Sequence, residues 1–375
     1  MSDDAAAQPP SESSAAGDYL CPTCGGRMAF DAARQSLLCA FCSATGAAGA
    51  GGAARQIQEH DLEAGLAQAQ QRGYGPAVRS FSCEQCGARV SYGENTTASS
   101  CDFCGSARVL EQRDQRQPLR PESVIPFQID RATANVRFSS WLGSLWFRRS
   151  DLKKLARLSE MTGMYVPYWA FDSRVASSWR AEAGYHYYVT ESYTTQDAQG
   201  RSVQRTRQVQ RTRWERARGS RQDHYDDLLE CGSKGLSREL TRKLEPFDTG
   251  RLVPYDPSYL VGWKAEEYSL DLAQAWDVAQ ERMEQEQRQR CSRDVPGDTQ
   301  RGLEVDSRFS ERRFKHLLLP IWISVYRYRE RPFVFLVNGQ TGEVTGHAPW
   351  SVIKILLFSA LVLGLLVAYV TLTQR

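Results

Sequence analysis

The longest hydrophobic stretch of the chain is ILLFSALVLGLLVAYVTL, which occupies residues 355–372 and contains no charged side chain. At about 1.5 Å per residue these residues make a helix of roughly 27 Å, close to the roughly 30 Å hydrocarbon core of a bilayer. Trp350 and Lys354 precede the stretch and Tyr369 lies near its end, where aromatic rings and amines favour the membrane interface. The pattern predicts a transmembrane helix at residues 352–372. The alternative, a buried core helix, would need protein partners on every side.

Long segments rich in aromatic and β-branched residues, with alternating polar positions, predict an antiparallel sheet. The first expected strand is MYVPYWAFDSRVASSWRAEAGYHYYVTESYTT, and a polar strand, SVQRTRQVQRTRWERARG, returns from the turn QDAQG. The segment KHLLLPIWISVYRYRERPFVFLVNGQTGEVTG predicts two further strands, and its Asn-Gly and Thr-Gly pairs supply turn residues that tolerate a positive φ. VIPFQI, from Val124, is expected to be the strand that opens this domain.

Four segments have apolar residues at helical spacing. ATANVRFSSWLGSLWF carries Val136, Trp141, Leu145 and Trp146 near such a spacing. DLKKLARLSEM repeats the pattern, and DLAQAWDVAQERMEQEQRQRC is amphipathic at its start and polar at its end. IQEHDLEAGLAQAQ predicts a shorter helix that Gly65 is expected to weaken. We expect the first two helices to pack on the sheet.

Composition and charge indicate where in the cell the protein is located. The 375 residues carry a formal net charge of +3, which is too small to identify a partner, and the mean hydropathy of −0.50 indicates a polar chain apart from its hydrophobic end. Residues 1–17 are predicted to be disordered because they hold few large apolar side chains. They also lack the basic and apolar regions of a signal peptide, so we expect the bulk of the chain in the cytosol and a single C-terminal anchor in the membrane.

Cysteine spacing is the strongest chemical signal in the chain. Eight of the ten cysteines form Cys-x-x-Cys pairs, and the pairs fall into two groups in which fourteen residues separate one pair from the next. The eight residues are Cys21, Cys24, Cys39, Cys42, Cys83, Cys86, Cys101 and Cys104. Four thiolates at this spacing are typical ligands of a tetrahedral zinc ion. The sequence therefore predicts two zinc ribbons, at residues 18–46 and 80–112, each with a small hairpin and one structural Zn²⁺ ion.

The residue after each cysteine pair takes part in a sharp turn of the backbone, where glycine is favoured. Gly25, Gly87 and Gly105 occupy three of these positions, whereas Ser43 occupies the remaining one and is expected to loosen its turn. Four protein ligands leave no open position for water, so the predicted metal sites are structural. The alternative is a thioredoxin-like redox pair, and the doubled pairs and the lack of a surrounding βαβ pattern argue against it.

Together these patterns predict an α+β fold with two small N-terminal zinc ribbons, a mixed helix and antiparallel-sheet domain, and one C-terminal transmembrane helix. The other expected boundaries are a linker with a short helix at residues 47–79, a linker at 113–123 and the α+β domain at 124–348. The Gly/Ala run AAGAGGAA at the start of the first linker predicts a flexible spacer.

The polar return strand is rich in arginine, with eight arginines between residues 201 and 221 and one acidic residue, Glu215, in the same run. Four of them share one face of a strand and are candidates for contact with phosphate or lipid: Arg205, Arg207, Arg211 and Arg213. Such a face can meet anionic lipid headgroups or the phosphates of a nucleic acid. The alternative is a solvated hairpin face, or an edge strand that charge protects from aggregation.

The sequence shows no catalytic constellation. The five histidines have no metal-ligand spacing, and neither a P-loop nor a GxSxG motif is present. Asp226 and Asp227, near His224, could be drawn as a hydrolytic cluster, but we expect a surface loop there. The sequence therefore predicts that the protein is not an enzyme.

Several motifs resemble a bacterial family of membrane-anchored double zinc-ribbon proteins, whose members are often labelled primosomal or helicase-like because of their ribbons. The motifs are the two cysteine groups, MYVPYWAFDS, YLVGWKAEEYSLDLAQAW, and LLLPIWISVYRYRERPFVFLVNGQTGEVTG directly before the apolar stretch. The NGQTGEV turn is also similar to the hairpin turn of PepSY-type domains. Some family members are associated with membrane-stress systems, alongside phage-shock-type and SPFH-type membrane proteins. The resemblance implies a protein that recruits a cytosolic partner to the membrane.

We therefore expect a non-enzymatic, membrane-anchored adaptor that contacts membrane lipid and a protein partner, of SPFH type or phage-shock type. The alternative is a membrane-tethered nucleic-acid-binding protein that uses the ribbons and the arginine-rich strand. The ribbons themselves carry few arginines and few aromatic residues, which favours the adaptor.

Overall fold

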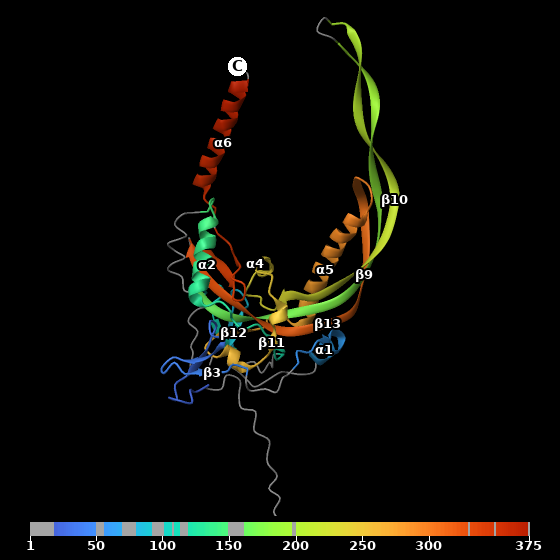
Figure 1. Cartoon of the computed structure of the whole chain (residues 1–375). Coiled ribbons are helices and arrows are strands. Elements are labelled where there is room, and N and C mark those ends of the chain that lie inside the picture. The colour runs from blue at the N-terminus through green and yellow to red at the C-terminus, as the bar shows by residue number, and fades with distance from the viewer. Residues whose placement is uncertain are drawn as a thin grey trace, which may run out of the picture.

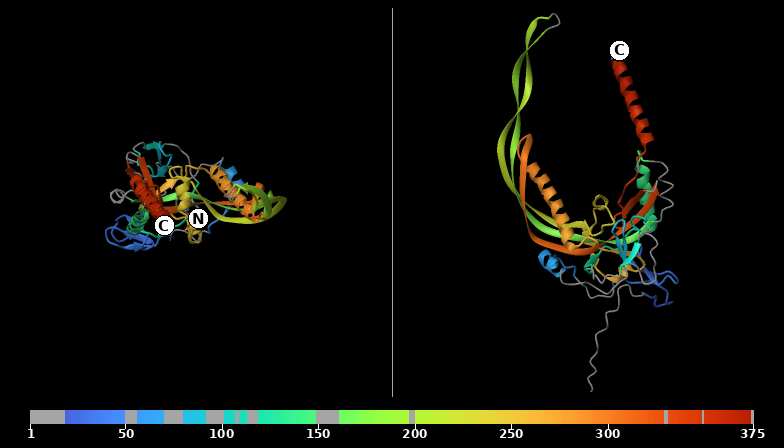
Figure 2. Two further views of the ribbon diagram at one scale, coloured as in Figure 1. Left: turned by 90° about the horizontal axis from the view of Figure 1, so that it is seen from above. Right: turned by 180° about the vertical axis from the view of Figure 1, so that it is seen from behind.

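The computed structural model describes residues 19–49, 56–69, 80–91, 101–106, 109–112, 119–148, 161–196, 200–328, 331–348 and 350–373. The N-terminal segment predicted to be disordered lies outside this part of the chain, as does the predicted helical segment 151–161 except for Met161, which begins a strand. Within the described residues, a three-stranded sheet and a twelve-stranded sheet form the body. One helix and one long hairpin project from this body in the same direction (Figure 1 and Figure 2).

The small sheet consists of β1 (Met28–Asp31), β2 (Ser36–Cys39) and β3 (Thr45–Gly46). The large sheet consists of β4 (His60–Asp61), β5 (Ser80–Cys83), β6 (Arg89–Ser91), β7 (Val109–Gln112), β8 (Ser123–Val124), β9 (Met161–Gln196), β10 (Ser202–Cys231), β11 (Val253–Pro254), β12 (Lys264–Glu267), β13 (Thr299–Tyr328), β14 (Arg331–Asn338) and β15 (Val344–Gly346). The described helices are α1 (Leu62–Ala69), α2 (Arg131–Ser144), α4 (Arg238–Lys243), α5 (Leu272–Asp294) and α6 (Val352–Thr373), with short 3-10 turns η1 (Thr249–Arg251) and η2 (Pro257–Leu260).

Two long antiparallel strands, β9 and β13, form the centre of the large sheet, and their pairing runs from Met161 opposite Ser324 to Gly184 opposite Thr299. β10 pairs with the other edge of β9, and β14 continues the sheet beside β13. The alternating sequence pattern predicts a part of each of these four strands, but it does not predict residues 299–314 of β13 or residues 220–231 of β10. It does not predict β15, which follows the turn after β14 and pairs back onto it.

The expected opening strand VIPFQI is mostly irregular, and this prediction was too long. Ser123 and Val124 alone form β8, which pairs with β11 and β13. Pro126 has no N–H to donate to a neighbouring strand. The N–H groups of Gln128 and Ile129 instead donate to the carbonyl of Gly339, at 2.9 and 3.0 Å.

The large sheet is covered differently on its two faces. One face packs against α2 at one end and against α1 and α5 at the other, through clusters that include Tyr165 and Phe171. The opposite face packs against α4 and the second cysteine group, in a cluster that includes Met164 and Val166. Because successive side chains of a strand point to opposite faces, β9 supplies both cores at once.

Helix α2 begins at the predicted place, where the side chain of Asp130 accepts a hydrogen bond from the N–H of Thr133. Two of the predicted residues, Trp141 and Leu145, are partly buried against the core, but the fully buried residues are different ones. Its core-facing side chains are Ala134, Phe138 and Leu142, spaced four residues apart on one helical face. Val136 and Trp146, which the sequence pattern selected, are exposed.

Helices α1 and α5 form as predicted, and they contact each other. Asp271 caps the start of α5 by accepting from the N–H of Gln274, and α5 buries Trp276 against the sheet. Gly65 in α1 is explained by close packing, because a β-carbon there would overlap the ring of Phe314. The glycine that the sequence presents as a weakness is therefore what lets α1 approach the sheet.

Helix α6 is long and apolar enough to cross a membrane, by length and composition, and none of its strongly apolar stretch is buried in the structure. Its first turn is fixed to the body. The N–H of Ser351 donates to the carbonyl of Phe147 at 2.9 Å, and Nζ of Lys354 donates to the carbonyls of Trp146 and Arg148 at 3.2 and 2.9 Å. The rest of the helix extends away from the body (Figure 1).

Candidate metal centres

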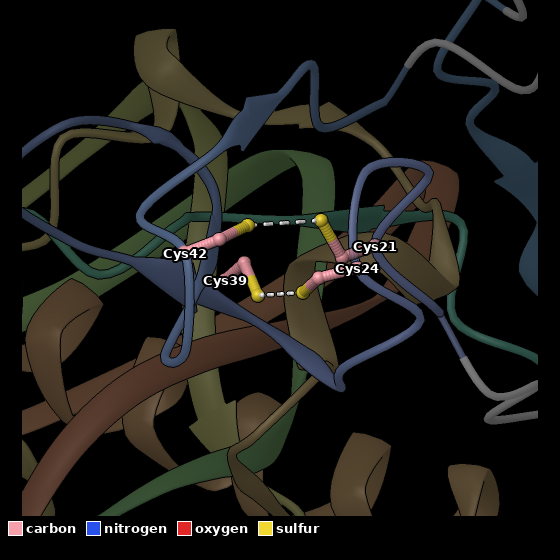
Figure 3. Close-up of side chains that lie close together, drawn as sticks. All are labelled: Cys21, Cys24, Cys39 and Cys42. Atoms are coloured by element: carbon pink, nitrogen blue, oxygen red, sulfur yellow. Dashed lines mark hydrogen bonds between the residues drawn. The ribbon is translucent and has the colours of Figure 1, made fainter.

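The first cysteine group lies at one end of the β1–β2 hairpin, where the side chains of its four members converge (Figure 3). The Sγ atoms of Cys21 and Cys42 are 3.5 Å apart, as are those of Cys24 and Cys39. All four Sγ atoms lie within 4.8 Å of one another. Zinc–sulfur bonds of about 2.3 Å in a tetrahedron separate the sulfurs by roughly 3.8 Å, so this group can hold a metal ion.

The second cysteine group repeats the arrangement. The Sγ atoms of Cys83 and Cys104 are 3.6 Å apart, the Sγ atoms of Cys86 and Cys101 are also 3.6 Å apart, and all four again lie within 4.8 Å. The two groups differ in exposure: the first has two exposed members, whereas the second has three buried members and one half-buried member. Both groups fit the predicted zinc ribbons, and the second is the more enclosed.

The backbone of all four cysteine pairs follows one pattern. In the first pair, the N–H of Cys21 donates to the carbonyl of Gly26, and the N–H of Gly25 donates to the carbonyl of Cys21. The same two hydrogen bonds recur in the other three pairs. The residue after each pair has a positive φ, at Gly25 (71°), Ser43 (60°), Gly87 (75°) and Gly105 (67°). Ser43 thus keeps the geometry of the turn. Because serine has a β-carbon, it is strained in this left-handed conformation.

A Ser43→Gly variant is expected to hold the first metal ion more firmly, by about 0.5–1 kcal/mol, because glycine adopts the left-handed conformation without strain. The release of zinc to a colorimetric chelator should slow by about two- to fivefold. Gly25→Ser is the matched control, since a β-carbon at Gly25 meets no atom within 4 Å and tests the backbone conformation alone. It should release zinc faster. Unchanged rates in both variants would contradict the strain argument.

Each group contains at least one cysteine whose thiolate form is favoured. The backbone N–H of Thr23 lowers the pKa of Cys21 to about 6, and in the same group the backbone N–H of Cys42 also lowers the pKa of Cys39. A hydrogen bond from Cys86 lowers the pKa of Cys101 to about 5, helped by the backbone N–H groups of Cys104 and Phe103. The same contact raises the pKa of Cys86, which holds the shared proton. Because the thiolate is the metal ligand, each site offers a ready first ligand at neutral pH.

The second ribbon is part of the large sheet. Its strand β6 pairs with β12, with Val90 opposite Glu266, and β5 and β7 extend the sheet beyond β6. Lys264 on β12 donates to both carboxylate oxygens of Asp102, at 2.8 and 2.9 Å. The buried cysteines of this site belong to the same core cluster as Met164 on β9. The second metal centre is thus enclosed by the body.

The first ribbon docks on the residues directly before β12. The N–H of Phe30 donates to the carbonyl of Val261 at 2.9 Å, and Nε1 of Trp263 donates to the carbonyl of Phe30 at 3.0 Å. Its own cysteines form a separate small cluster with Met28, against which Trp263 packs. One continuous stretch, residues 261–267, therefore receives both ribbons. This stretch lies within the YLVGWKAEEYSL motif of the sequence.

The four predicted arginines lie together on the β9–β10 hairpin, away from both metal centres (Figure 1). Arg207 and Arg211 each place a guanidinium nitrogen on Glu191, at 3.3 and 2.6 Å. Arg213 pairs with Glu215 at 2.9 Å. Sequence reasoning did not identify Glu191 as a partner, because it comes from the opposite strand.

A third acidic group, Asp172, Asp226 and Asp227, also brings its carboxylates within 4.8 Å. The predicted surface loop at Asp226 and Asp227 is wrong, because both lie in β10, where the register with β9 shifts between Tyr225 and Leu228. Nζ of Lys315 lies 2.6 Å from Oδ1 of Asp227, so an ammonium group already supplies the positive charge. We assign this group a structural role at the irregular part of the strand.

Comparison with known proteins gives one informative similarity. The chain is 27% identical over 336 residues to the uncharacterized protein YdjG of Bacillus subtilis (strain 168), and this match covers 89% of the chain and 90% of that protein. No family model matches the sequence. No solved structure gives a significant match either.

Proposed function

We propose that the protein is a membrane-anchored adaptor, in which α6 lies in the membrane and the first zinc ribbon binds a protein partner. The proposal combines two features of the structure. α6 can cross a membrane, and the first ribbon lies on the side of the body from which α6 points away (Figure 1). A membrane around α6 therefore leaves the first ribbon facing the solution.

A difference between two equivalent phenylalanines carries this proposal. Phe41 and Phe103 occupy the same position of their ribbons, directly before the last cysteine. Phe103 is 0% exposed, and it lies with Ala88 against Gly235, where a β-carbon would be 3.1 Å from the ring. Phe41 is 79% exposed. In the second ribbon this surface docks onto protein, so we infer that the first ribbon uses it in the same way, on a separate partner.

The ribbons fit a structural use of zinc. Each cysteine group supplies four ligands, and a zinc ion held by four cysteines has no open position at which water could be activated. The bound metal would rigidify the turn that presents Phe41. The resemblance described above directs the choice of partner to phage-shock-type or SPFH-type membrane proteins.

Photo-cross-linking tests the proposal directly in bacterial membranes. A benzoylphenylalanine placed at Phe41 is expected to give one discrete cross-linked product in the full-length protein. The same group at Arg34, an exposed residue of the same ribbon, should give none. Equal cross-linking at both positions would contradict a specific docking surface.

A Phe41→Ser variant is expected to keep two zinc ions per chain and its membrane location, and to lose the cross-linked partner on affinity capture. A roughly 79%-exposed ring contributes little to the fold, so its removal should leave thermal unfolding unchanged. Leu110→Ser is the matched control, since Leu110 is an exposed apolar residue of the second ribbon. Recovery of the partner with Phe41→Ser but not with Leu110→Ser would mean that the second ribbon, and not the first, binds the partner.

A further inference from the structure

The outer part of the long hairpin consists of two strands alone. We call this part the distal hairpin: residues 185–196 of β9 and 202–213 of β10, paired from Tyr185 opposite Arg213 to Gln196 opposite Ser202. The third strand, β13, stops opposite Gly184, and α5 ends at Asp294. Beyond that level the distal hairpin extends away from the body (Figure 1). An isolated two-stranded sheet is only marginally stable in water, so we expect a further interaction to stabilise this segment.

The two faces of the distal hairpin have different chemistry. In the observed register, the four arginines share one face with Tyr185, Tyr187, Tyr193 and Glu191. The opposite face contains threonine, serine, glutamine, one tyrosine and one histidine, and no Asp, Glu, Lys or Arg. We call the first the arginine–tyrosine face and the second the neutral face.

Positive charge dominates the arginine–tyrosine face. Four arginines and one glutamate leave an excess of three positive charges, as many as the formal net charge of +3 of the whole chain. The guanidinium of Arg207 lies 5.6 Å from the ring centre of Tyr193, and that of Arg213 lies 5.9 Å from that of Tyr185. Each guanidinium has five donors, so bonds to Glu191 leave donors for phosphate oxygens.

The distal hairpin and α6 project in the same direction from opposite ends of the body, and they reach similar heights (Figure 1 and the right view of Figure 2). A bilayer that contains α6 therefore extends to the level of the distal hairpin. Arginine is among the side chains that are costliest to place in hydrocarbon, whereas guanidinium groups and tyrosine rings are both favourable in the headgroup layer.

We propose that the arginine–tyrosine face of the distal hairpin lies on the anionic headgroups of the membrane that α6 enters, as a second membrane contact. This inference rests on the proposed function, because it takes α6 as the membrane anchor. The hairpin reaches the headgroups by bending where β9 loses its third-strand support, at Gly184. Arginine–phosphate contacts then fix the orientation of the body on the membrane, which a single helix does not.

Chymotrypsin protection of the full chain tests the proposal. The protein is reconstituted in vesicles of phosphatidylcholine, with or without phosphatidylglycerol, and cleavage is mapped by mass spectrometry. The exposed tyrosines of the distal hairpin, Tyr187, Tyr188 and Tyr193, provide the cleavage sites, and Phe41 provides a reference on the body. Anionic vesicles should slow cleavage in the distal hairpin by about tenfold relative to Phe41, and high salt should remove the effect.

Two variants distinguish an effect of the arginine charges from an effect on the fold of the distal hairpin. A variant with all four arginines changed to glutamine should be cleaved equally in both kinds of vesicle, whereas Gln204→Ser with Gln208→Ser, on the neutral face, should stay protected. Equal cleavage of the unmodified protein in both vesicles would overturn the proposal, as would protection by duplex DNA or RNA in place of anionic lipid. Flotation in alkaline carbonate distinguishes the two claims. A protein that floats without protection lacks only the hairpin contact, and one that does not float lacks the anchor.

Discussion

A Cys101→Ser variant is expected to lose the second metal ion and to unfold at a Tm lower than that of the unmodified protein by roughly 10 °C or more. Cys39→Ser, the equivalent change in the first ribbon, is expected to lose its metal ion while the Tm of the body falls by no more than about 3 °C. Both cysteines are buried, so the two changes are matched in their local environment. The difference comes from what each ribbon is attached to.

The free energy of zinc binding, of the order of 10 kcal/mol, directly stabilises the folded state of a small ribbon. The second ribbon cannot unfold alone, because Val90 and Phe103 pack in the same core as Met164 and Val166 at the centre of the large sheet. Each large side chain that leaves this core costs about 1.5–3 kcal/mol. The first ribbon has its own small core and touches the body at its surface, where Phe30 meets Trp263 and Tyr259. Ala32 joins the neighbouring cluster, and Gln35 donates to the carbonyl of Phe127. It can therefore detach without exposing the centre of the sheet.

Metal content and thermal unfolding, measured on the full chain in detergent, check this prediction. Elemental analysis should give two zinc ions in the unmodified protein and one in each variant. Tryptophan fluorescence reports the body, since Trp169 and Trp322 are buried there. Equal losses of Tm in the two variants would show that the ribbons are equivalent, contrary to the structure. For the same reason, variants of the first ribbon, not of the second, are suited to studying partner binding.

The local features of this protein could be predicted from its sequence. Cysteine spacing predicted both groups of four cysteines that could hold a metal ion, because the residues of a ribbon are near neighbours along the chain. The uncharged apolar stretch predicted α6, and residue alternation predicted most of β9 and the second half of β13, from Lys315. In each case the determining interactions lie within a single segment or between segments joined by a turn.

The long-range features could not be predicted in this way. Nothing in the second ribbon alone indicates that β6 pairs with β12, about 175 residues further along the chain. Phe41 and Phe103 hold the same position in their ribbons, directly before the last cysteine, and the sequence of the ribbons does not show that one is buried and the other exposed. The buried face of α2 was predicted only in part, because Val136 is more hydrophobic than Ala134, whereas the position of each residue on the helix places Ala134 against the sheet and Val136 in solvent.

Leu363→Lys together with Leu366→Lys is expected to release the protein from the membrane fraction, from nearly complete retention in alkaline carbonate to less than about one-tenth. Residues 352–373 contain fourteen Leu, Ile, Val and Phe residues, each of which favours insertion by roughly 0.3–0.6 kcal/mol, about 6 kcal/mol in all. Two central lysines oppose insertion by roughly 2.5–3.5 kcal/mol each and also remove two leucines. The balance for insertion is then close to zero or unfavourable.

The natural lysine of α6 does not weaken this argument, because Lys354 is in the first turn and its amine is bound to carbonyls of the body. Leu363→Ile with Leu366→Ile is the control, and this variant should remain in the membrane. The released double-lysine protein should still contain two zinc ions, since the apolar stretch of α6 is not buried against the body. Retention of the double-lysine protein after carbonate treatment would mean that another element holds it. If that element is the arginine–tyrosine face, high salt should then release the protein, because screening weakens contacts between exposed charges.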